Sequence, residues 1–372
     1  MSDQDPIDGS ASASVDVTVR EKDAPATGSG LVKIVAVVAG LFVFILALEL
    51  LKKGAGGIAP LFERLSVDGI WDSLGMGWLM AYVVLSGSPV AAIALTLFSG
   101  GVISVLQTFA MITGSRLGAS FIVLFICFIY YLRGQHRVAS VSIGVLSFLV
   151  TATIYLPAMA LGYLSLTRGW LDGLHFGTPA ALNSIMDTVY DPIVGWLGSL
   201  LPRWGMFILG VVALLAAFQL FDKALPEVRP ESTGFQRIAD IIYRPQVMLL
   251  LGLGVTMVTL SVSVSISVLV PLSIKGYIRR ENLIPYIMGC NISTFVDTLL
   301  ASLLLGTPLA FTVVLTEMLS VAVISGLVLL LGYRHYQAGI EAVLERIVRS
   351  RASLITFIVI ITLIPLGLIA LT

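Results

Sequence analysis

Two stretches of the chain repeat each other at a fixed offset of 175 residues, without a gap. Glycines and paired serines are the best evidence for the match, because they recur inside long apolar runs where apolar matches alone would mean little. The matched pairs are Gly77 with Gly252, Ser86 with Ser261, Ser88 with Ser263, Gly101 with Gly276 and Gly114 with Gly289. An internal repeat in a membrane protein indicates a transporter whose binding site lies where the two halves meet.

The composition requires lipid around most of the chain. Of the 372 residues, 57% are hydrophobic and 12% are charged, whereas soluble domains have about 25% charged residues. The formal net charge is zero, and since no basic block is present we expect no nucleic-acid partner. The cysteines and histidines lack zinc-type spacing and no nucleophile–base pair is apparent, so we predict neither a cofactor nor an enzyme.

Nine apolar segments each approach the ~20 residues that a helix needs to cross a bilayer. Ser, Gly and Pro interrupt two of them, 77–98 and 246–274. Because broken backbone at membrane depth is tolerated only inside protein or along a cavity, we predict that these two are re-entrant and do not cross. The predicted crossing segments are 31–51, 104–132, 141–164, 204–221, 283–305, 309–332 and 352–371.

Positive charge in the short loops predicts the orientation. The loop after residue 132 and the loops 222–245 and 333–351 are rich in arginine, so we place them in the cytoplasm, whereas 165–202 goes outside. Counting crossings then gives the two halves opposite orientations, which predicts an inverted repeat. The predicted fold class is therefore all-α: a polytopic membrane protein of two inverted-topology repeats with broken, re-entrant serine-rich segments.

These features divide the chain into five parts. Residues 1–29 are rich in Ser, Asp, Ala and Gly without an apolar period, so we predict a disordered tail rather than a signal peptide. We expect a multi-pass protein of the cell membrane with a cytoplasmic N-terminus, and its oligomeric state stays open. The other parts are membrane repeat 1 at 30–165, an extracytoplasmic loop with an amphipathic segment at 166–203, membrane repeat 2 at 204–332, and a cytoplasmic linker with the final transmembrane helix at 333–372.

The second repeat resembles the sodium–phosphate cotransporter (type II sodium-dependent phosphate symporter) family. Stretches similar to that family's serine, proline and glycine motifs stand, in order, at Leu260-Ser261-Val262-Ser263, Pro271-Leu272 and Gly289-Cys290-Asn291-Ile292-Ser293-Thr294. The first repeat matches more weakly, at Leu85-Ser86-Gly87-Ser88 and Gly114-Ser115-Arg116-Leu117-Gly118-Ala119. Leucine replaces both glutamines of the family's serine motif, and arginine replaces its first asparagine.

The resemblance implies secondary transport of an inorganic anion, most simply sodium-coupled phosphate symport, with a site in the unwound stretches. Hydroxyls and free carbonyls suit a small cation, and half-helix N-termini suit an oxyanion. A proton is the alternative coupling ion, another small anion is the alternative substrate, and a degenerate, non-transporting scaffold or regulatory protein is the alternative function. The predicted binding residues are Ser86, Ser88, Gly114, Ser115, Arg116, Ser261, Ser263, Gly289, Asn291, Ser293, Thr294 and Asp297, with Ser86, Ser261, Thr294 and Asp297 as sodium candidates.

Three charged residues stand farther inside apolar segments than any others. Arg116 and Asp297 would each cost about 2.5–3.5 kcal/mol at the bilayer centre, and the repeat register brings them close across the repeat interface. Two interpretations stay open: an anion ligand and a cation or proton ligand, or a structural ion pair. For Glu317 we expect that it simply reaches water near the end of its segment, rather than serving as a relay.

Overall fold

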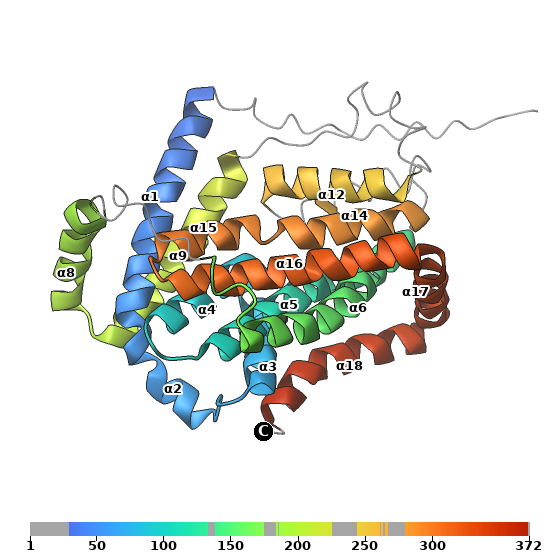
Figure 1. Cartoon of the computed structure of the whole chain (residues 1–372), viewed down its shortest axis with the longest axis horizontal. Helices are drawn as coiled ribbons and strands as arrows, with labels where there is room; N and C mark the ends of the chain where they lie inside the picture. The colour runs from blue at the N-terminus through green and yellow to red at the C-terminus, as the bar shows by residue number, and fades with distance from the viewer. Residues whose placement is uncertain are drawn as a thin grey trace, which may run out of the picture.

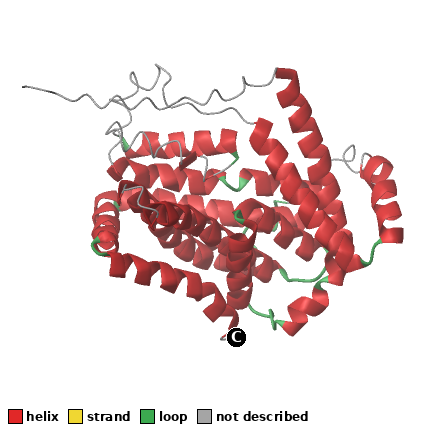
Figure 2. Cartoon of the chain, turned by 180° about the vertical axis from the view of Figure 1, so that it is seen from behind, coloured by secondary structure: helices red, strands yellow, loops and turns green. Residues whose placement is uncertain are grey.

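The computed structural model describes residues 30–132, 138–174, 186–224, 244–260 and 280–370, with a few single positions between them. Throughout these ranges every regular element is a helix (Figures 1 and 2). Seven of the described helical stretches are long and apolar enough to cross a membrane. The chain is therefore an all-α polytopic membrane protein. The predicted tail 1–29 lies outside the described residues.

The seven membrane-crossing stretches coincide with the seven predicted segments, whereas the two interrupted segments do not qualify. One of the seven is formed by two helices, α14 and α15, which are separated by a turn at Thr294 and Phe295. The crossing helices are α1 (Gly30–Gly54), α5 (Val105–Leu132), α6 (Val138–Arg168), α9 (Arg203–Ala224), α14 (Arg280–Ser293) with α15 (Val296–Leu304), α16 (Pro308–Leu331) and α18 (Arg351–Ala370).

Shorter helices connect the crossing helices. A 3-10 turn at Ala55–Gly57 and α2 (Ala59–Arg64) follow α1, and α8 (Asp191–Leu200) lies within the predicted amphipathic segment. Within the predicted linker, α17 (Tyr333–Val348) is a helix that the sequence analysis missed. Its buried residues are spaced three or four apart, as expected for a helix with one apolar face, and they are Ile340, Leu344 and Ile347.

Both interrupted segments are broken at the same repeat position. α3 (Ile70–Val84) ends at Leu85, and α12 (Pro245–Thr259) ends at Leu260, which is 175 residues later. Both leucines adopt the left-handed conformation, with φ of 57° and 49°, which is unfavourable for a residue with a bulky side chain. In the first repeat Ser86 is extended and α4 (Gly87–Ser99) begins directly after it. The backbone therefore turns sharply at this point.

Tight helix crossings also recur at the repeat offset. In each half, glycines let two helix backbones touch, α3 against α5 and α12 against α14, and a β-carbon at any of these glycines would collide with a backbone carbonyl oxygen. The colliding pairs are Gly77 with Met111, Gly252 with Tyr286, Gly114 with Leu74 and Gly289 with Leu249. Every member of a pair in the first half has its equivalent 175 residues later, so the sequence repeat is also a repeat in packing.

One pair of equivalent helices, α5 and α14 with α15, runs in opposite directions in the two halves. The starts of α5 and α16 lie together, since Val105 and Leu309 line one cavity, and Thr113 bonds Glu317 further along both helices, so α5 and α16 are parallel. A short turn joins α15 to α16, and α14 with α15 runs back along α16 (Figure 1). α14 therefore runs against α5, its repeat equivalent. An inverted repeat requires these opposite helix directions. That its two-fold axis lies in the plane of the membrane stays a prediction.

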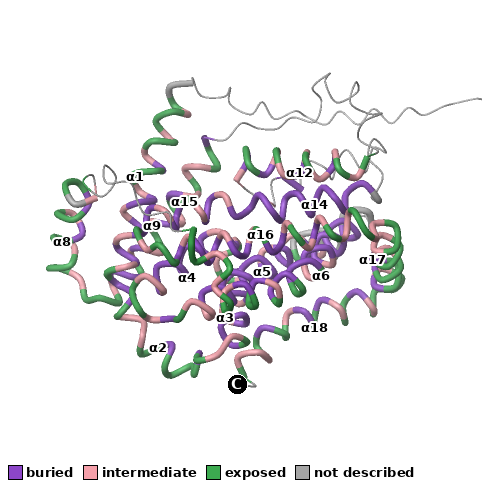
Figure 3. Tube along the Cα trace, in the orientation of Figure 1, coloured by how far each residue is buried: buried purple, intermediate pink, exposed green. Residues whose placement is uncertain are grey.

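The molecule is most buried around α5, α6 and α14, whereas α1, α9 and α18 have apolar outer faces (Figure 3). Val38, Val212 and Ile360 are 62%, 57% and 54% exposed. Contiguous apolar surface of this kind is costly in water, and lipid solvates it without penalty.

Replacing Leu85 by Gly tests the strain at the helix break. Because Leu85 is 68% exposed, the change loses little packing, and glycine adopts positive φ without the about 1–2 kcal/mol that the left-handed conformation costs other residues. We expect the thermal stability in lipid to be unchanged or raised. The control Leu97→Gly, in the fully buried part of α4, should lose more than about 2 kcal/mol. Equal losses for both variants would contradict the strain.

Candidate functional site

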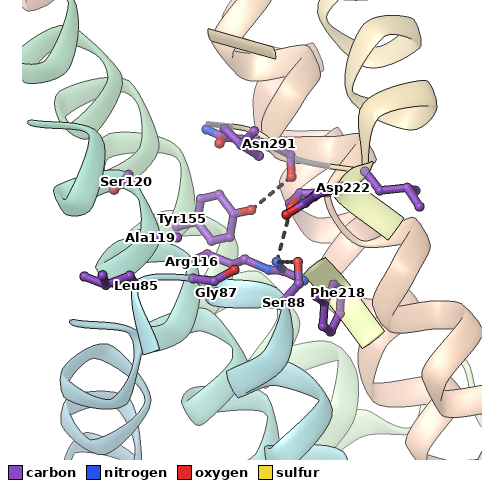
Figure 4. A pocket seen from close by; sticks show the side chains of 14 residues that line it. Leu85, Gly87, Ser88, Arg116, Ala119, Ser120, Tyr155, Phe218, Asp222 and Asn291 are labelled. Carbon is purple, nitrogen blue, oxygen red and sulfur yellow. Dashed lines mark hydrogen bonds between the residues drawn. The ribbon is translucent and has the colours of Figure 1, made fainter. Parts of the chain in front are cut away.

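A cavity of about 90 Å³ lies where the two helix breaks converge (Figure 4). Its wall comes from both halves of the chain, which is the location that the repeat predicts. At roughly 10–15 Å³ per water molecule it has room for several waters or one small ion. The lining residues are Leu85, Ser86, Gly87, Ser88, Arg116, Ala119, Ser120, Tyr155, Phe218, Asp222, Leu260, Val262, Asn291 and Thr294.

The guanidinium of Arg116 is the main charged group on this wall, and its side chain is 4% exposed. Nη1 donates hydrogen bonds to Ser88 Oγ at 3.2 Å and to Thr294 Oγ1 at 3.1 Å, and Nη2 donates to Thr298 Oγ1. The guanidinium carbon also lies 4.9 Å from the ring centre of Phe295, within the range of a cation–π contact. Arg116 on α5 thus joins α4 of the first half to the α14–α15 turn of the second.

Asp297 forms a loose ion pair with Arg116. The distance from Arg116 Nη2 to Asp297 Oδ1 is 3.8 Å, beyond the length of a hydrogen bond, and Thr298 Oγ1 donates to the same carboxylate oxygen at 2.9 Å. Arg116 Nε and Asp297 Oδ2 have no hydrogen-bond partner among the described residues. The predicted approach of the two charges across the repeat interface is confirmed, and each charge keeps one unused polar atom.

The first turn of α4 contributes backbone donors beside Arg116. Gly87 and Ser88, its first two residues, both line the cavity, and no side chain caps this end of the helix. The free N–H groups and positive dipole end at a helix N-terminus favour an anion. Together with the guanidinium they place several N–H donors on one side of a cavity whose lining also includes the Asp222 carboxylate.

Asn291 and Tyr155 form the opposite part of the wall. Tyr155 OH donates to the backbone oxygen of Asn291 at 2.9 Å, as Figure 4 shows. The Asn291 amide nitrogen donates to Thr151 Oγ1 at 3.1 Å. These bonds fix α14 against α6 beside the cavity.

The structure sorts the predicted binding residues into three groups. Ser86, Ser88, Arg116, Asn291 and Thr294 line the cavity, and Asp297 lies behind Arg116. Among the predicted residues that do not line it, Gly114 and Gly289 pack helices, whereas Ser115 and Ser293 donate to carbonyls of their own helices. Ser261 and Ser263 lie outside the described residues, although their neighbours Leu260 and Val262 line the cavity.

Several site residues were missed by the sequence analysis. Ser120 stands one helical turn after Arg116, so the 3.6-residue period of α5 would have found it. Thr298 follows Asp297 directly and bonds both charged side chains. Tyr155 and Asp222 lie on α6 and α9, whose sequences gave no repeat match that would single them out.

The interpretation that Glu317 reaches water is wrong. Glu317 is 2% exposed, and Thr113 Oγ1 lies 2.7 Å from its Oε1. It stands well inside α16 rather than at its end, because α16 starts at Pro308 and continues to Leu331. A carboxyl group is therefore enclosed by protein at this point.

A cation at this site would depend on hydroxyl and carbonyl oxygens with the carboxylates of Asp222 and Asp297. Within the described ranges no three His, Cys, Asp or Glu side chains come together, and oxygen donors suit hard cations rather than transition metals. No family model, no curated protein and no solved structure matches this chain.

Proposed function

We propose that this protein is a secondary transporter of a small inorganic oxyanion, with phosphate as the first candidate and sodium as the coupling ion. The observation that supports this most is the Arg116 guanidinium beside the uncapped start of α4, in a cavity lined by both halves of the repeat. A planar guanidinium matches the geometry of phosphate oxygens. The resemblance to sodium–phosphate cotransporters supports the same choice of substrate.

The loose ion pair explains how anion and cation binding would be linked. At rest Asp297 balances the charge of Arg116, so the buried site is close to neutral. An anion bound to Arg116 leaves Asp297 uncompensated, and a buried unpaired charge is costly. A sodium ion bound at Asp297, with oxygens of Thr294 and Ser86 as further candidates, would restore neutrality. Each ion thus favours binding of the other.

The non-transporting scaffold remains the competing function. Leucine at both motif glutamine positions, Leu85 and Leu260, favours it, because both side chains line the cavity where polar ligands are expected. A scaffold, however, gains nothing from a buried guanidinium whose Nε has no partner among the described residues. Measured transport separates the two functions.

Uptake into proteoliposomes tests the proposal directly. We expect radiolabelled phosphate to accumulate when an inward sodium gradient is imposed, and much less with a potassium gradient. Liposomes with Arg116→Ala protein serve as the matched control and should show background uptake. Sodium-independent uptake would remove sodium as the coupling ion, and background uptake by the parent protein at every gradient would favour the scaffold.

A further inference from the structure

Glu317 is a buried carboxyl group that does not line the proposed anion site. Its side chain lies among α5, α6 and α16, and its Oε2 has no hydrogen-bond partner in the described part of the chain. The ion pair of Arg116 with Asp297 does not include it. An ionised carboxylate in these surroundings would be buried without a cation in ion-pair contact among the residues that the structure describes, and such groups take up a proton instead.

The hydroxyl of Thr113 gives independent evidence for that proton. Thr113 Oγ1 lies 3.1 Å from the backbone oxygen of Phe109 and 2.7 Å from Glu317 Oε1. A hydroxyl has one hydrogen to donate and can accept as well. If Glu317 is ionised, both partners compete for this hydrogen. If Glu317 is protonated, it donates to Thr113 and Thr113 donates to Phe109, so both short contacts are satisfied.

The other ionisable groups around Glu317 belong to the anion site. Arg116 follows Thr113 by one turn of α5, Tyr155 is the buried phenol on α6, and Asp297 is the carboxylate on α15. On α14, Tyr286 and Cys290 bond Ser265 instead. α17 meets α16 at its far end, and the described part of α4 has no ionisable side chain. One cation therefore stands among two carboxyl groups.

A second cavity, of about 270 Å³, ends one helical turn before Glu317, since Val313 is its last lining residue on α16. It is formed by the starts of α5 and α16 and the end of α6, and Asp172, Thr167 and Leu309 at its mouth are exposed. Its inner wall includes Thr312, one turn before Thr316 on α16. The Thr316 hydroxyl is buried without a partner among the described residues, and Glu317 follows directly.

We propose that Glu317 is a proton-binding site, reached through the cavity among α5, α6 and α16, whose occupancy depends on the charge at Arg116. On release the O–H bond of the carboxylic acid breaks, the bonding electrons stay on the carboxylate, and the proton passes to water in that cavity. An anion at Arg116 cancels the positive charge that favours ionised Glu317, so anion binding holds the proton more tightly. This link rests on the proposed function, whereas protonation of Glu317 does not.

Infrared spectroscopy of the parent protein in lipid nanodiscs tests protonation. We expect a carbonyl stretching band of a protonated, buried carboxylic acid near neutral pH. The band should be absent in Glu317→Gln and retained in the control Glu345→Gln, whose side chain is exposed on α17. Because glutamine has the shape of the protonated acid, Glu317→Gln should fold and melt like the parent. An unchanged band, or failure of Glu317→Gln to fold, would overturn the proposal.

Titration of the same band with and without inorganic phosphate tests the link to the anion site. In the parent protein we expect the carboxylic-acid band to disappear at a higher pH when phosphate is present than when it is absent. If calorimetry shows that phosphate binds and the titration does not move, the link is wrong while the proposed function stands. If phosphate does not bind, the proposed function fails, and the band still decides whether Glu317 holds a proton.

Discussion

Arg116→Ala is expected to abolish phosphate binding and to lower stability by about 3–5 kcal/mol, the usual cost of breaking a buried ion pair. The change removes the hydrogen bonds to Ser88, Thr294 and Thr298 and leaves Asp297 uncompensated. Calorimetric titration with phosphate and thermal melting in lipid measure the two effects. The control Arg346→Ala, at an exposed position of α17, should change stability by less than about 0.5 kcal/mol.

Asp297→Asn separates the roles of the two charges. Asparagine keeps a carbonyl oxygen for the Thr298 hydroxyl, so we expect phosphate binding to persist while its dependence on sodium is lost. The double variant should melt at a higher temperature than Arg116→Ala alone, because no buried charge is then left without a partner, yet it should not bind phosphate. A double variant that binds phosphate like the parent would show that Arg116 is a structural residue and not a ligand.

Gly252→Ala is expected to be among the most disruptive single-methyl additions in the chain. The new β-carbon would collide with the backbone oxygen of Tyr286, and since a helix backbone cannot rotate away as a side chain can, α12 and α14 must separate. Overpacking of this kind costs about 1–3 kcal/mol, sometimes more. Yield of monodisperse protein and melting temperature measure the loss.

Gly254→Ala is the matched control, because it lies on the same helix two residues later with open space around its Cα. There alanine should be neutral or stabilising by up to about 1 kcal/mol, since it favours the helix over the unfolded chain. Similar losses for both variants would mean that helix propensity, and not contact between the helices, decides stability at this crossing.

The membrane helices could be predicted because each depends on local composition. Apolar length defined the seven crossing stretches, and Ser, Gly and Pro marked the two breaks. α17 was missed because its loop was interpreted from charge alone, although Ile340, Leu344 and Ile347 have a helical spacing. The predicted linker is thus partly a helix on the protein surface.

The site was predicted where repeat register and charge agreed, as at Arg116 and Asp297. The site was less well predicted where every residue of a family motif was assigned to it. Neighbouring residues of a helix point in different directions, so only some of them can face the cavity. Arg116 and Ser120 line the cavity from one face of α5, whereas Ser115, next to Arg116 in sequence, does not line it. Gly114 and Gly289 have a packing role because each lies against a backbone carbonyl of another helix. The sequence of one helix alone does not show which residue of the other helix it contacts.

The hydrogen bonds of Arg116 to Thr294 and Thr298 can form only late in the synthesis of the chain. Its partner Thr298 lies 182 residues later in the chain, so at roughly 5–20 residues per second the ribosome needs about 10–40 s to supply it. During that interval the Asp297 carboxylate, which pairs with Arg116 in the finished protein, has not yet been made. The buried cluster around Arg116 therefore cannot form until most of the second half has been synthesised.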